Sequence, residues 1–249
     1  MIFRVRYCDE NTIDELTNSY LWFSRPLNFK GDTKDANIGA FVTDTEAIKR
    51  GLMYVDPNFD FDKWYNSMSF TGICCFTKYL PSLKELRHFP KCTKGNAICI
   101  EYNKNSLQDF FVNKSKHPIY PCFNEVVYSP SPTKIEMCDE WSILWEKDEN
   151  GCLYKTIPGI LNEHPREFDK FIRILLTRIN LKFEKQSEER IILGGTNIPP
   201  HDDNTRGYKI TIPSDCISKV YIYPKVPVEY IEKLYRIDSV SYTHLRAHE

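Results

Sequence analysis

Residues 182–195, KFEKQSEERIILGG, contain a crowded polar run that passes into a short apolar segment ending at two glycines. If the chain is extended from Gln186 onward, its side chains alternate between two faces, and Gln186, Glu188 and Arg190 project to one side. An amide, a carboxylate and a guanidinium in a row can place a fixed carboxylate beside a cationic transition state. If the segment is instead a helix end, its polar residues pair one turn apart in solvent. The spacing alone favours the helix end.

Short strand and helix patterns flank this segment without a regular alternation. We expect strands at 2–7, 20–24, 72–77, 97–102, 125–128, 189–193, 208–212 and 219–223. We expect helices at 12–18, 43–51, 59–68, 137–145, 165–180 and 228–235. The first helix is predicted from the capping-box spacing of Thr12 and Glu15, and the helix at 165–180 from a continuous apolar stripe. This irregular mixture predicts an α+β fold in one domain, residues 1–238, and not a doubly wound parallel sheet.

The end of the chain, 239–249, follows a different pattern. Its sequence, SVSYTHLRAHE, has no clear period and resembles translated sequencing-adapter read-through at the end of an assembled gene. We therefore predict that this tail is not native and leave it out of the functional reasoning.

Composition narrows the class of protein. The 249 residues include 33 lysines and arginines against 34 aspartates and glutamates, so no global charge drives the chain toward nucleic acid or an anionic membrane. No apolar run approaches the ~20 residues of a membrane helix, and the N-terminus lacks a signal-peptide core. Nine cysteines without a C-x-x-C pair favour reduced, buried thiols over disulfides or zinc. We expect a cytoplasmic protein without a bound metal or a membrane partner.

Four ordered segments carry a family resemblance. They are FRVR at 3–6 with LWFSRPLNF at 21–29, then ICCFT at 73–77, KGNAICIEY at 94–102, and the polar-to-apolar run at 183–192. Together they resemble an uncharacterised, mainly bacterial family known as domain of unknown function 2971. The chain departs from that family after Phe29, where KGD replaces an Asn-Asp-Pro type of turn, and it lacks the methionine–tryptophan pair expected before the glycine-containing strand.

That family is in turn distantly similar to the ADP-ribosyltransferase fold, which implies a split mixed or antiparallel sheet with flanking helices. The similarity implies that Glu188 is the catalytic glutamate, which binds the nicotinamide ribose and stabilises an oxocarbenium-like state. It also implies that Gln186 orients the acceptor, that Thr77 supports the nicotinamide pocket, and that Arg4 or Arg6 contacts the pyrophosphate. The expected NAD-binding residues are Arg4, Arg6, Thr77 and Arg190.

Three functions follow as hypotheses. The first is an NAD-dependent ADP-ribosyltransferase-like enzyme, of a defence or toxin type, that acts on an unknown protein or nucleic-acid acceptor. It predicts that Glu188, Thr77 and an arginine of the first strand line one cleft. The second is a non-catalytic module on the same fold that binds a protein or a nucleic acid. The third is a metal-dependent hydrolase or nuclease that uses Glu188 with acidic residues such as Asp202.

Overall fold

The computed structural model describes residues 1–25, 72–115, 119, 121–130, 166, 173–174, 176–193, 207–237 and 240–245, and the backbone of 146–147 and 153–154. The first half of the chain forms β1 (Ile2–Tyr7), α1 (Glu10–Thr17), β2 (Tyr20–Ser24), β3 (Gly72–Thr77), η2 (Glu85–His88), β4 (Ala97–Tyr102), α5 (Lys104–Asp109), η3 (Phe110–Lys114), β5 (Asn124–Glu125) and β6 (Val127–Ser129). The second half forms β7 (Glu146–Lys147), β8 (Leu153–Tyr154), β9 (Arg178–Asn180), η4 (Leu181–Gln186), β10 (Glu188–Leu193), β11 (Gly207–Thr211), η5 (Ser214–Cys216), β12 (Ile217–Ile222), α9 (Val228–Tyr235) and β13 (Ser241–His244).

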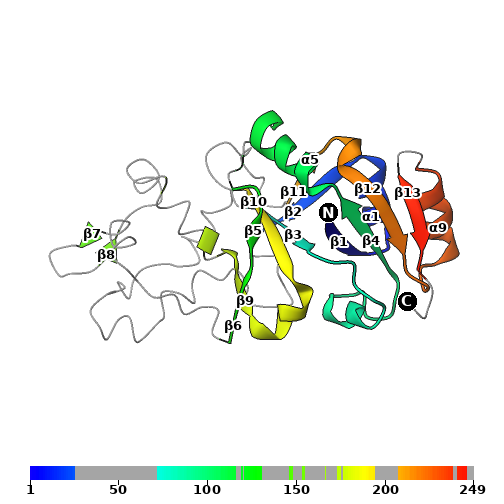
Figure 1. The fold of residues 1–249 in the computed structure, drawn as a ribbon, viewed down its shortest axis with the longest axis horizontal. Helices are drawn as coiled ribbons and strands as arrows, with labels where there is room; N and C mark the ends of the chain where they lie inside the picture. The colour runs from blue at the N-terminus through cyan, green and yellow to red at the C-terminus, as the bar shows by residue number, and fades with distance from the viewer. Residues whose placement is uncertain are drawn as a thin grey trace.

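One mixed sheet organises these elements. Within the described residues it has nine strands, with the order β11-β2-β3-β1-β4-β12-β13, with β10 added beside β3 and β5 beside β10 (Figure 1). Its pairs are antiparallel except for β12 and β13, and β6 and β9 form a separate parallel pair. The expected α+β fold with a mixed sheet is therefore confirmed.

Strand β3 is the branch point of the sheet. β10 pairs with the whole length of β3, from Thr77 opposite Glu188 to Gly72 opposite Leu193. The other edge of β3 is shared, because β1 meets it at Thr77 and β2 meets it at Ile73. β1 and β2 therefore separate from each other, and each leads into its own part of the sheet.

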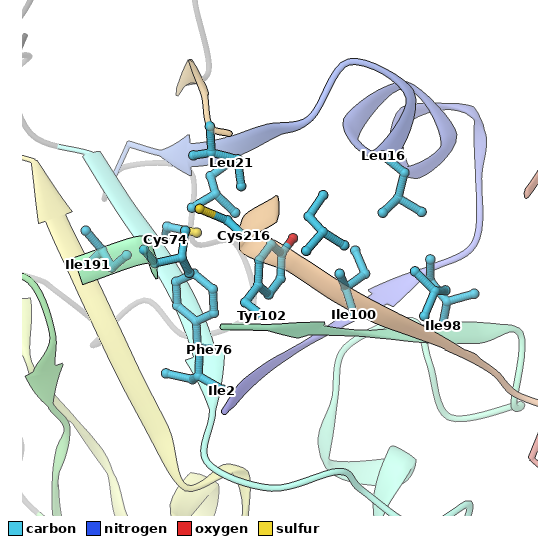
Figure 2. Close-up of a cluster of buried hydrophobic side chains, with 14 of the residues drawn as sticks. Ile2, Leu16, Leu21, Cys74, Phe76, Ile98, Ile100, Tyr102, Ile191 and Cys216 are labelled. Carbon is cyan, nitrogen blue, oxygen red and sulfur yellow. The ribbon is translucent and has the colours of Figure 1, made fainter. Parts of the chain in front are cut away.

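Register assigns the side chains to two faces of the sheet. The α1 face carries Ile2, Cys74, Phe76, Tyr102 and Ile191, which belong to the same buried core cluster as Leu16 of α1 (Figure 2). The opposite side, here called the Glu188 face, carries Phe3, Thr77 and Glu188, because these three residues lie opposite one another on β1, β3 and β10. A second core cluster covers part of that face, where Leu86 of η2 packs with Phe3 and Tyr223.

The sequence patterns predict the central strands well. The strands expected at 2–7, 20–24, 72–77 and 97–102 have the predicted bounds, as does the helix expected at 228–235. The first helix begins earlier than expected, because Asp9 and not Thr12 is its N-cap: the Asp9 carboxylate accepts from the Thr12 amide at 3.0 Å. The helix expected at 165–180 ends sooner, since Arg178–Asn180 form strand β9.

Other expectations fall outside the described residues or differ from the structure. The helices expected at 43–51, 59–68 and 137–145 lie outside the described residues, as does Asp202. The strand expected at 125–128 divides into β5 and β6. No helix in the described segments is long and apolar enough to cross a membrane.

The tail contributes an edge strand. Ser241–His244 form β13, which runs parallel to β12 and pairs with it from Lys219 opposite Ser241 to Ile222 opposite His244. Val240 just before it is buried, whereas Ser241 and His244 are exposed. Tyr242 packs partly buried against the main core, and Leu245 against the second core cluster. The tail therefore covers the open edge of β12, and its non-native origin remains a prediction.

Removal of residues 239–249 should leave the domain folded. We expect a loss of about 2–4 kcal/mol in the free energy of unfolding, because the burial of Val240 and the packing of Tyr242 and Leu245 are partly offset by the ordering of the strand. Urea unfolding of a chain that ends at Asp238 measures this loss. Amide exchange should increase on the β12 edge that faces β13, while amides between β12 and β4 stay protected. Complete unfolding of the shortened chain would show instead that the tail is an integral strand.

The buried thiols should be unreactive in the folded protein. Seven of the nine cysteines lie in the described residues, and six of these seven are buried, namely Cys8, Cys74, Cys92, Cys99, Cys122 and Cys216. Burial raises the pKa of Cys74 to about 11 and that of Cys122 to about 12, so the reactive thiolate is scarce at pH 8. A disulfide-exchange reagent at pH 8 should modify no more than three thiols rapidly in the native state and all nine in guanidinium. Rapid native reaction of more than three thiols would contradict this burial.

Candidate functional site

The candidate site is the corner of the sheet where β3 ends and β10 begins. Thr77 is the last residue of β3, and Glu188, the first residue of β10, lies directly opposite it. Thr77 is 2% exposed, and its hydroxyl has no hydrogen-bond partner among the described residues. A buried hydroxyl without a partner is costly, which makes this group a candidate to bond a ligand or a water molecule that reaches it. The structure therefore brings together two of the residues expected to bind or cleave NAD.

Glu188 is held by a buried ion pair. The Nε of Arg190 donates to Oε1 of Glu188 at 2.7 Å, and Nη1 of Arg190 donates to the Leu176 carbonyl at 2.6 Å. The two side chains project to the same face two residues apart, and they are 7% and 1% exposed. Oε2 of Glu188 has no hydrogen-bond partner in the part of the chain that the structure describes. Arg190 therefore orients the carboxylate and is itself too enclosed to contact a pyrophosphate.

Gln186 does not share a strand with Glu188. It ends the short helix η4, and Ser187 between them adopts a left-handed conformation with φ of 43°. The backbone turns at this residue, so the alternation expected from an extended Gln186 does not hold. The side-chain amide of Gln186 donates to the His88 carbonyl and ties η4 to η2. The helix-end interpretation is correct up to Gln186, and the strand interpretation is correct from Glu188 onward.

Arg4 and Arg6 lie on the α1 face, away from Glu188. Register pairs Arg4 with Ile100 of β4, and the Arg4 guanidinium forms a buried ion pair with Glu15 of α1. Nη2 of Arg4 also donates to the Trp22 carbonyl at 3.0 Å, across the gap between β1 and β2. Arg6 approaches the same Glu15 carboxylate at 3.1 Å. The structure therefore does not bring these arginines together with Thr77 and Glu188, and no single cleft contains all three groups.

Tyr128 is a neighbour of Glu188 that the sequence analysis did not identify. Its hydroxyl oxygen accepts the backbone N–H of Glu188 at 2.6 Å, which leaves its own O–H free to donate. Burial raises the pKa of Tyr128 to about 12, so the phenol is protonated at neutral pH. Tyr128 lies in the short strand β6, 60 positions before Glu188, and no local sequence pattern connects the two residues.

Glu189 lies on the α1 face, in a different electrostatic setting. Lys104 approaches its carboxylate at 2.6 Å, and Lys78 lies 3.7 Å from its other oxygen while bonding Glu125 at 2.6 Å. Each of these acids has a lysine partner. Nowhere in the described segments do three or more His, Cys, Asp or Glu residues gather as metal ligands would.

Comparisons of the chain with protein-family models, with curated proteins and with solved structures found no match. The resemblance to the family of unknown function and to the ADP-ribosyltransferase fold therefore remains a prediction from the four sequence segments.

Loss of the Arg190 charge should destabilise the protein strongly. Arg190→Gln leaves the buried Glu188 carboxylate without its partner, which we expect to cost about 3–5 kcal/mol in the free energy of unfolding. Urea unfolding at pH 7 measures this, with Lys185→Gln as the matched control because Lys185 is exposed and forms no ion pair in the described structure.

The double variant Glu188→Gln with Arg190→Gln should recover part of the loss, because no unpaired charge then remains buried. Equal stability of Arg190→Gln and Lys185→Gln would show that the buried pair does not hold this corner together.

Proposed function

We propose that the corner formed by Thr77 and Glu188 binds NAD without an arginine of β1, and that the protein cleaves the bond between the ribose and nicotinamide, as an ADP-ribosyltransferase-like enzyme does. The observation that carries the proposal is the register of three adjacent strands. β1, β3 and β10 are the strands that the family resemblance singles out, and Thr77 and Glu188 lie opposite each other on the last two. The arrangement supplies a carboxylate with one unused oxygen beside a hydroxyl that lacks a partner.

The proposed chemistry follows from the charge that develops in the reaction. The bond between the ribose carbon and the nicotinamide nitrogen breaks, and its electron pair neutralises the departing pyridinium ring. The ribose becomes an oxocarbenium-like cation, and an acceptor oxygen or nitrogen then bonds to its carbon and loses a proton. The Glu188 carboxylate stabilises the cationic state more than the neutral ribose, which lowers the barrier. Oε2 is free to accept a ribose hydroxyl, because Arg190 uses only Oε1.

The remaining expected residues have different roles in this proposal. Arg190 orients Glu188, and its fixed pairing replaces the expected contact with pyrophosphate. Arg4 and Arg6 are assigned to the sheet and not to NAD, since Glu15 and the Trp22 carbonyl occupy them. Gln186 binds the His88 carbonyl through its amide nitrogen, and its oxygen remains available to an acceptor. Tyr128 joins the site as a neutral hydroxyl donor beside Glu188.

Nicotinamide release from NAD tests the proposal. Glu188→Gln should lower the rate about 10²–10³-fold, because it removes the charge that stabilises the transition state while it keeps the shape of the side chain. Thr77→Val should lower kcat/KM about tenfold through the loss of one hydrogen bond. Glu125→Gln is the matched control, because Glu125 lies on the neighbouring strand with an exposed side chain.

Each variant needs an unfolding curve, so that lost activity is not confused with lost structure. Wild-type activity in a folded Glu188→Gln protein would rule out the proposed role of this residue.

The second candidate is a non-catalytic binding module on the same fold. It is favoured by the pairing of Arg4, Arg6 and Arg190 inside the protein, which leaves none of these arginines for a pyrophosphate. This alternative predicts no heat of binding when NAD is titrated into the wild-type protein, whereas the enzyme requires NAD binding.

A further inference from the structure

A surface rich in lysine and arginine lies next to the candidate site. It is formed by the connection between β3 and β4, by η4, and by the turn after β12. Its cationic side chains are all exposed. We call this set the basic surface, and it comprises Lys84, Arg87, Lys91, Lys94, Lys185 and Lys225.

The three segments form one continuous surface. η2 packs against η4, and the Gln186 side chain donates to the His88 carbonyl between them. The backbone N–H of Lys225 donates to the Gly95 carbonyl at 3.2 Å, which places the turn after β12 beside Lys94. In Figure 1 the green-cyan η2 and the yellow η4 lie near each other at the lower rim of the molecule.

The cations of the basic surface are not neutralised by the protein. None of them forms an ion pair within the described structure, whereas Lys78, Lys104, Lys114, Lys209 and Lys233 all do so elsewhere. Residues 78–96 and 181–186 contain only two acids, Glu85 and Glu184. The Glu85 carboxylate is already used, since it accepts the Ser82 amide at 2.7 Å and the Ser82 hydroxyl at 2.8 Å.

This local excess contrasts with the whole chain, whose formal net charge is −1. Exposed like charges that gather without internal partners repel one another, and the repulsion is relieved by a bound polyanion. Such a surface attracts phosphates strongly, because each neutralised phosphate releases condensed counterions.

We propose that the basic surface binds single-stranded nucleic acid. Aromatic rings favour this partner over one that offers charge alone. Phe89 and Phe183 are partly exposed beside the cations, and the Lys182 ammonium lies 4.6 Å from the centre of the Phe183 ring. Phe89 also packs against the second core cluster, so only the exposed part of its ring can meet a base. Partly exposed rings next to lysines can stack with unpaired bases, while the ammonium groups follow the phosphates.

The position of the surface connects it to the candidate site. η4 carries Lys185 and ends at Gln186, and only Ser187 separates it from Glu188. The Tyr79 hydroxyl donates to the Lys185 carbonyl, so the connection that leaves β3 after Thr77 runs along η4. A strand bound on the basic surface therefore ends beside Glu188. In this proposal the bound nucleic acid is the acceptor of the transferred ADP-ribose group. This assignment of the acceptor rests on the proposed function.

Fluorescence anisotropy with a labelled 20-nucleotide single strand, without NAD, tests the binding separately from any catalysis. The test variant combines Lys84→Gln, Arg87→Gln, Lys91→Asn and Lys94→Gln, with asparagine at 91 because that residue has φ of 65°. The control combines Lys114→Gln, Lys209→Gln, Lys233→Gln and Arg236→Gln, which removes the same charge elsewhere on the molecule. Unfolding curves confirm that both variants are folded.

The test variant should bind at least tenfold more weakly than the wild type at 0.1 M salt, and the control should bind within twofold of it. The slope of log K against log salt concentration should become shallower by roughly 3, as expected for the loss of four phosphate contacts with a single strand. Equal losses in the two variants would overturn the proposal. So would equally tight binding of the wild type to polyglutamate or to vesicles with anionic headgroups. Binding that persists in a catalytically inactive Glu188→Gln protein supports the surface whether or not NAD is cleaved.

Discussion

The Arg4 guanidinium holds the two parts of the sheet together. β1 and β2 share one edge of β3, so they must separate, and the gap between them exposes backbone groups that lack ladder partners. Arg4 fills this gap: it donates to the Trp22 carbonyl of β2 and pairs with Glu15 of α1. A buried guanidinium is expensive to desolvate, and the carboxylate and the carbonyl offset that cost. Arg4, which the sequence resemblance assigns to NAD binding, therefore stabilises the point where the sheet divides.

A comparable pair fixes the start of β10. Arg190 is almost fully enclosed, and it directs Glu188 toward the last residue of β3. The left-handed Ser187 permits η4 to end and the strand to begin within one residue. Local strain of this kind often accompanies functional sites, and here it brings an exposed helix next to a buried carboxylate. The turn at Ser187 separates η4, which has no buried residue, from β10, whose residues are all buried.

Sequence patterns predicted the elements that periodicity controls. The strand expected at 72–77 is the central strand β3, and the helix expected at 228–235 is α9 with the expected bounds. The single-residue choices were less predictable. Asp9, and not Thr12, is the N-cap of α1. Ser187 in the left-handed conformation interrupts the segment 186–193, whose sequence alternation suggested one extended strand. The roles of Arg4 and Tyr128 depend on partners in distant strands and helices, which no local spacing reports.

The distribution of charge connects the fold to its proposed partners. Two of the buried arginines are paired with buried acids, Arg4 with Glu15 and Arg190 with Glu188. The six cations of the basic surface, on η2, η4 and the loops beside them, face solvent without an ion-pair partner among the described residues, although the chain as a whole is almost neutral. Segregation of this kind does not stabilise an isolated fold, because exposed like charges repel. Such a surface becomes favourable when it binds an anion. Only Ser187 separates η4 from Glu188, so an anion bound there lies close to the candidate site. In the described residues of that site, Oε2 of Glu188 and the Thr77 hydroxyl are the groups without a hydrogen-bond partner.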